Sequence, residues 1–162
     1  MTMTSVQQLH NILQTEQATA SQLLTMLKYE RSALTKSDVD AMTELTAKKQ
    51  PLVVSLEKLG RQREAVLQAE GFSAGKDGLA AFIANQTEQH SRVLNNMVDT
   101  LKITAKACRE HNQVNGGIVN VNRQYLQQAM NILRGREMTP SAYGPGGEYT
   151  SQVVRQPLLG RV

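Results

Sequence analysis

The feature that most constrains this chain is a helical seam in its second half. Stepping back from Leu133 by four and three residues in alternation gives positions that are apolar at both ends and polar in the middle. This is the spacing of a coiled-coil seam, which requires a long α-helix packed against other helices. The positions are Leu94, Val98, Leu101, Ala105, Cys108, Asn112, Asn115, Val119, Asn122, Leu126, Ala129 and Leu133.

Three more helices are predicted. A first helix over about 5–34, with Ser5 as its cap, follows from apolar residues that recur every seven positions. A second, over about 38–70, follows from three-four spacing and ends at Gly71. A short connector helix over 79–85 would bury Phe82 and Ile83, and the seam helix itself would occupy 87–134. The residues of the first heptad row are Val6, Leu13, Ala20, Leu27 and Leu34.

Gly116 and Gly117 fall inside the polar part of the long seam, beside Asn115. A Gly inside a helix costs about 1 kcal/mol relative to Ala, so the pair predicts a kink or break near 116–117, with these three residues as a hinge. The seam asparagines have two interpretations that can coexist. A buried Asn fixes the register of a coil, or the helix leaves its seam to pair with another protein.

Four charged residues stand in the seams of the first two predicted helices. Glu16 and Glu30 can lie at the seam edge and reach water, and the stems of Lys49 and Arg63 can extend to water in the same way. If the two helices are antiparallel, the acidic and basic side chains can instead pair with one another.

Together the patterns predict an all-α fold. It is an elongated antiparallel helical bundle or coiled coil of three long helices and a short connector helix, over residues 1–135. Residues 135–162 contain five glycines and three prolines and have no helical period. We therefore expect a flexible, mobile tail over 136–162, because little apolar area is available there to offset chain entropy.

Composition excludes several function classes. The net charge is +4, but Lys and Arg do not cluster with aromatic partners, so we expect no nucleic-acid binding. Cys108 is the only cysteine and the three histidines are scattered, so we expect no catalytic site, no metal and no cofactor. Lacking 18 consecutive apolar residues or a signal-peptide pattern, the chain is predicted to be cytoplasmic, without direct membrane insertion.

The seam beyond Ile118 has the spacing of a helix that docks into a partner's groove. Such an interface uses anchors at i, i+3 or i+4, and i+7. Met130 adds a contact that can adapt to more than one partner. The remaining anchors are Val119, Asn122, Leu126, Ala129 and Leu133.

Three stretches of the sequence resemble the FlgN family of flagellar export chaperones, which are chaperones of the type III secretion kind. They are His111–Val119, with its Asn-Gly pair before aliphatic residues, Ala129–Leu133, and the Tyr-Gly motif of Tyr143–Gly147. The resemblance implies a cytoplasmic, non-enzymatic chaperone for the hook-associated proteins of the hook–filament junction. It would bind them through their C-terminal regions and deliver them to the export gate, a membrane protein.

The resemblance also assigns roles to residues of this sequence. It places gate docking on Tyr143. The alternative function is a structural coiled-coil adaptor or homodimerisation module that buries the last helix. The residues on which client contact falls are Ile118, Val119, Leu126, Ala129, Met130 and Leu133.

Overall fold

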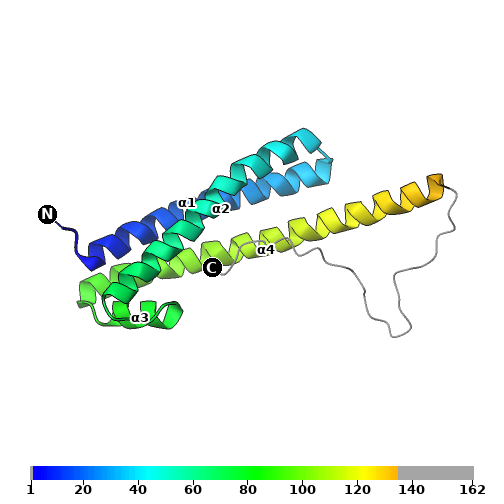
Figure 1. Cartoon of the computed structure of the whole chain (residues 1–162). Helices are drawn as coiled ribbons and strands as arrows, with labels where there is room; N and C mark the ends of the chain where they lie inside the picture. Colours follow the sequence, from blue (N-terminus) through cyan, green and yellow to red (C-terminus); the bar gives the residue numbers. More distant parts are fainter. Residues whose placement is uncertain (1, 135–162) are drawn as a thin grey trace, which may run out of the picture. The chain divides into compact units, whose positions relative to one another are not determined.

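The computed structural model describes residues 2–134, and their fold is all-α, as predicted. The helices are α1 (Ser5–Lys36), α2 (Val39–Ala69), α3 (Lys76–Ala84) and α4 (Glu88–Leu133) (Figure 1). The chain divides into two compact units, Met1–Asn115 and Gly116–Val162, and α4 contributes to both. The tail predicted over 136–162 lies outside the described residues.

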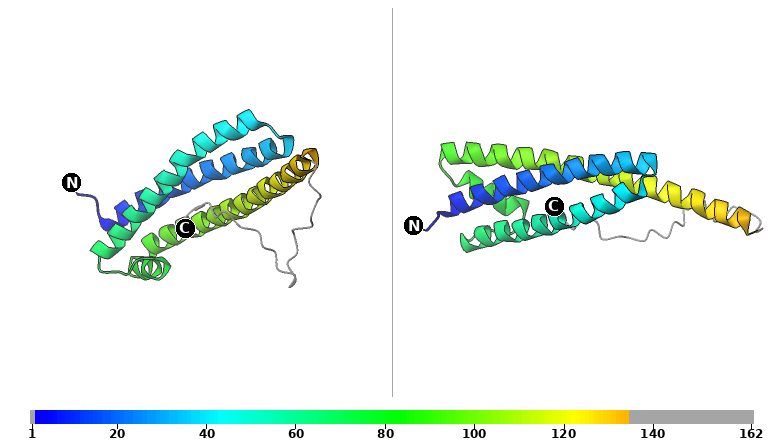
Figure 2. Two further views of the ribbon diagram at one scale, coloured as in Figure 1. Left: turned by 45° about the vertical axis from the view of Figure 1, so that its right-hand side comes forward. Right: turned by 90° about the horizontal axis from the view of Figure 1, so that it is seen from above.

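A turn of two residues joins α1 to α2. Ser37 adopts a left-handed conformation with φ 54°, and the Asp38 N–H donates to the Ala33 carbonyl at 3.0 Å, which closes α1. The Asp38 carboxylate then accepts from the Ala41 N–H at 3.1 Å and begins α2. The turn reverses the chain, so α1 and α2 lie side by side and antiparallel (Figures 1 and 2).

The antiparallel pairing brings the seam charges together. Arg63 Nη1 donates to both carboxylate oxygens of Glu16, at 2.6 and 2.8 Å, and Lys49 Nζ lies 2.5 Å from Glu30 Oε2. Glu16 is only 4% exposed, so the alternative in which it reaches water is wrong. Burial raises the pKa of the Glu16 carboxyl, and the nearby Arg63 opposes that shift. The two ion pairs fix the register of α2 on α1.

Within the first unit, α4 runs parallel to α1. Thr104 Oγ1 accepts from the Gln17 amide at 2.9 Å, and the Cys108 thiol contacts the Ala20 carbonyl at 3.5 Å. The partners are separated by 87 and 88 residues of sequence, and this nearly constant offset is that of two parallel helices. Since α2 is antiparallel to α1, the three long helices alternate in direction, as the predicted bundle requires.

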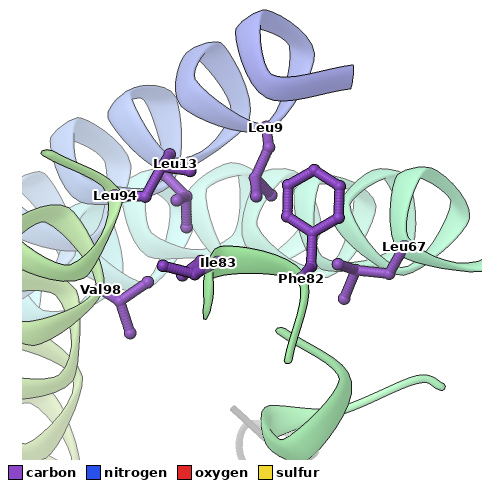
Figure 3. Close-up of a cluster of buried hydrophobic side chains, with 7 residues drawn as sticks. All are labelled: Leu9, Leu13, Leu67, Phe82, Ile83, Leu94 and Val98. Atoms are coloured by element: carbon purple, nitrogen blue, oxygen red, sulfur yellow. The ribbon is translucent and has the colours of Figure 1, made fainter. Parts of the chain in front are cut away.

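The apolar core lies where all four helices meet (Figure 3). Phe82 and Ile83 of α3 are each 2% exposed, which confirms their predicted burial. The Phe82 ring packs edge-on against Phe72, with centroids 5.5 Å apart. The connector α3 therefore completes the core. The residues of this cluster are Leu9, Leu13, Leu67, Phe82, Ile83, Leu94 and Val98.

Two predicted helix starts need correction. The cap of α1 is Thr4 rather than Ser5, because Thr4 and Gln7 form a reciprocal capping box, whereas the Ser5 hydroxyl donates to Glu70 Oε1. Helix α3 begins at Lys76 rather than at 79, so Gly78 is helical. A Cβ on Gly78 would lie 1.6 Å from the Ser73 carbonyl oxygen, so a glycine there allows the preceding loop to fold back onto the helix.

The end of α2 is as predicted. Gly71 has φ 82°, its N–H donates to the Gln68 carbonyl at 3.0 Å, and the Phe72 N–H donates to the Leu67 carbonyl at 2.9 Å. These are the two hydrogen bonds of a Schellman motif, which needs a left-handed residue where Gly71 stands. The motif turns the chain so that Phe72 reaches the core.

Gly78→Ala should lower the free energy of unfolding by about 1–3 kcal/mol, because the new methyl group has no space beside Ser73. Gly60→Ala, in the middle of α2, is the matched control. No described atom outside its own helix backbone lies within 4 Å of a Cβ there, so Ala should stabilise the protein by about 1 kcal/mol. Urea unfolding followed by circular dichroism checks both, and equal effects would contradict the close contact.

Candidate partner-binding site

The described part of the second unit, residues 116–134, is unusually rich in exposed apolar side chains. Residues 116–133 contain seven large exposed apolar side chains, and residues 2–115 contain the same number over a far longer stretch. Leu126 is 63% exposed and Leu133 is 86% exposed. Such a concentration of apolar surface makes this segment the candidate partner-binding site. The seven are Val119, Val121, Tyr125, Leu126, Met130, Ile132 and Leu133.

The predicted contact residues lie together on one side of this segment. At 3.6 residues per turn they share roughly one third of the helix circumference. Ile118 is half-buried and the others are exposed. The seam asparagine Asn122 is exposed within the same arc. The residues of this set are Ile118, Val119, Asn122, Leu126, Ala129, Met130 and Leu133.

Three exposed apolar residues were missed by the sequence analysis. Val121, Tyr125 and Ile132 are 47%, 67% and 62% exposed, and they form a row beside the predicted contact residues. Their spacing of four and seven is as helical as that of the seam. Stepping back from Leu133 by four and three passes over them, because those steps follow only one stripe of the helix. A full helical projection of residues 116–134 would have found them.

The predicted hinge begins at a residue that is firmly held. Asn115 is 2% exposed, and its amide nitrogen donates to the Leu27 carbonyl at 2.9 Å and to Glu30 Oε1 at 3.0 Å. Its amide oxygen accepts from Arg31 Nε at 3.2 Å. Since Glu30 also pairs with Lys49, one polar layer joins α1, α2 and α4. A buried Asn that fixes the register is therefore present at 115, whereas Asn122 is exposed.

The predicted kink or break near 116–117 does not end the helix, because α4 continues through Gly116 and Gly117. Glycine keeps its backbone N–H, and a cost of about 1 kcal/mol per residue is too small to end a helix that is extended on both sides. In the described part of the chain, no atom outside this helix's own backbone lies within 4 Å of a Cβ built on either glycine. Neither glycine is thus required by a close contact, although the boundary between the two units falls beside them.

The other candidate residues add no second site. Cys108 is buried, and burial raises the pKa of its thiol, which is the opposite of what a nucleophile needs. Within residues 2–134, no group of three or more His, Cys, Asp or Glu side chains could hold a metal ion. The helices described there are also too short or too polar to cross a membrane. Tyr143 lies outside the described residues.

The sequence and the fold both match a known family. The model of the family described as FlgN protein matches residues 1–151. The chain belongs to the FlgN family. The match confirms the family that the sequence resembles in His111–Val119, Ala129–Leu133 and Tyr143–Gly147.

A solved structure shares the fold of this FlgN-family chain. It is a crystal structure from Pseudomonas aeruginosa that carries the name of a flagella synthesis protein, FlgN. The two sequences are 29% identical, the TM-score is 0.61, and the match covers 68% of this chain and 84% of that one. No curated protein matches the sequence.

Asn115→Ala should lower the free energy of unfolding by about 1–3 kcal/mol, because it removes the buried amide that bonds the Leu27 carbonyl, Glu30 and Arg31. The control is Asn122→Ala, which changes an exposed Asn of the same seam and should shift stability by no more than about 0.5 kcal/mol. Chemical unfolding of both variants measures the difference. Similar values would show that the two asparagines have equivalent surroundings.

Proposed function

We propose that this chain is a cytoplasmic export chaperone of flagellar assembly. It binds the hook-associated proteins of the hook–filament junction through their C-terminal regions and delivers them to the membrane-embedded export gate. Membership of the FlgN family and the similarity to a flagella synthesis protein support the role in flagellar assembly. The observation that supports client binding is the exposed apolar surface of residues 118–133.

The chemistry of this surface suits a client segment that folds as it binds. Anchors at i, i+4 and i+7 recognise the apolar stripe of an amphipathic helix. A disordered segment loses conformational entropy when it becomes helical, so the complex keeps a moderate affinity and can be released at the gate. Met130, with its flexible side chain, allows the same surface to fit more than one client sequence.

Leu126→Asp combined with Leu133→Asp should weaken client binding about 100-fold or more, because it places two charges in an apolar interface. The control is Gln124→Asp combined with Asn131→Asp, which adds the same charges at the same spacing on the polar side of the helix. The C-terminal regions of candidate junction proteins serve as bait in pull-downs, and calorimetry gives the affinities. Both variants should stay as helical as the wild type by circular dichroism.

Two results would contradict this role. Loss of the global fold in the Leu126 and Leu133 variant would show that these residues form core rather than interface. A tight dimer of the protein alone, detected by sedimentation and lost in the same variant, would support the homodimerisation module instead.

Delivery can be separated from client binding. Tyr143→Ala should weaken binding to the export gate protein by about tenfold while leaving client affinity unchanged, because a buried aromatic side chain often dominates a small interface. The control is Tyr149→Ala, which changes the other tyrosine of the same stretch. Binding to the purified gate protein and to the client region is measured for both. Equal loss of both activities in Tyr143→Ala would contradict a dedicated gate contact.

A further inference from the structure

The apolar surface of residues 118–133 is about twice as wide as one partner helix can cover. At 3.6 residues per turn, the predicted contact residues and the row of Val121, Tyr125 and Ile132 form one continuous arc of roughly 180°. Asn122 is the only polar residue within that arc. The opposite half of the helix surface is entirely polar or glycine. It consists of Gly116, Gly117, Asn120, Arg123, Gln124, Gln127, Gln128, Asn131 and Arg134.

The first part of the same helix shows how wide a stripe one helix buries in its own bundle. Between Glu88 and Asn115, α4 buries Leu94, Val98, Cys108 and Asn115 in its bundle. These four residues lie within roughly 100° of the circumference, which is the usual width of a stripe that faces a core. Ile103, on the opposite side of that part of α4, is 72% exposed.

The wide arc has two edges. We name the row of Val119, Leu126 and Met130 strip one, and the row of Val121, Tyr125 and Ile132 strip two; Ile118 and Ala129 lie between them. Packed helices are about 8–10 Å apart, close to the diameter of one helix, so a single partner helix over strip one leaves strip two in water. Two partner helices, one over each strip, would cover the arc and also touch each other.

Charge distinguishes a client from a second copy of this chain. Residues 111–134 contain no Asp or Glu, while Arg123 and Arg134 adjoin strip one on the polar side. A second copy would bring the same arginines and no acidic partner for them. A helix with acidic side chains beside its apolar stripe would instead pair with Arg123.

We propose that the client supplies two amphipathic helices from one chain, which pack on strips one and two to form a three-helix bundle with residues 118–133. The helix over strip one carries acidic side chains opposite Arg123. This deepens the proposed function and rests on it. One chain supplies both helices because, once the first has docked, its covalent link holds the second at high effective concentration.

The test uses the client C-terminal region that the wild-type protein captures in the pull-down above. Three double variants change residues eleven apart to Gln on three sides of the helix. Val119→Gln with Met130→Gln changes strip one, and Val121→Gln with Ile132→Gln changes strip two. The control, Asn120→Gln with Asn131→Gln, changes the polar half. Calorimetry gives affinity and stoichiometry, and hydrogen exchange of the client shows which of its segments become helical and protected.

We expect one client per chaperone, with two separate protected segments in the client. Each strip variant should lower affinity about tenfold or more and remove protection from one segment, a different one for each strip. The control variant should change neither the affinity for the client nor the protection of its segments. A single protected segment that both strip variants weaken equally would overturn the proposal, as would a dimer of the free protein that the strip-two variant dissolves. Failure of the proposed function is a different result, in which the wild type captures no client region.

Discussion

The hydrogen bonds of Asn115 are the constraint on which the arrangement of the first unit depends. A long helix with a repetitive seam can slide along its partners, because each step of a heptad offers similar apolar contacts. Asn115 removes that freedom, since its amide finds the Leu27 carbonyl, Glu30 and Arg31 in one register only. The ion pair of Glu30 with Lys49 extends the same layer to α2. The polar contacts thus select one alignment of the helices. The apolar core stabilises that alignment but would stabilise shifted alignments in a similar way.

The apolar side chains of α4 are buried in its first part and exposed in its last part. Up to Asn115, the buried residues of α4 fit the narrow stripe that a helix shows to its own bundle. Beyond Gly117 the arc covers about half the helix surface, and its large side chains are exposed. No loop separates these two regions, although the boundary between the two units falls between them. The first part of α4 stabilises the fold and the last part presents an apolar surface, and only the side chains on their turns differ.

Much of this architecture could be predicted from local patterns, and the exceptions have physical causes. The periodic seams identified the helices, the burial of Leu94 and the seam position of Asn115. Helix continuity through Gly116 could not be read from propensity alone, because a modest local cost is outweighed by hydrogen bonds on either side. The early start of α3 depends on how closely a loop approaches Gly78, which is a tertiary contact. The row containing Val121 has helical spacing in the sequence, but it lies outside the stripe that alternating steps of four and three define.

The turn between α1 and α2 has a consequence for the order of folding. Ser37 closes α1 and Asp38 begins α2, so two residues adjacent in sequence form the whole connection of the hairpin. The two charge pairs between α1 and α2 lie inside this hairpin as well. Structures built from such local contacts form quickly and do not wait for distant segments. The contacts that set the register of this hairpin therefore all lie within the first seventy residues.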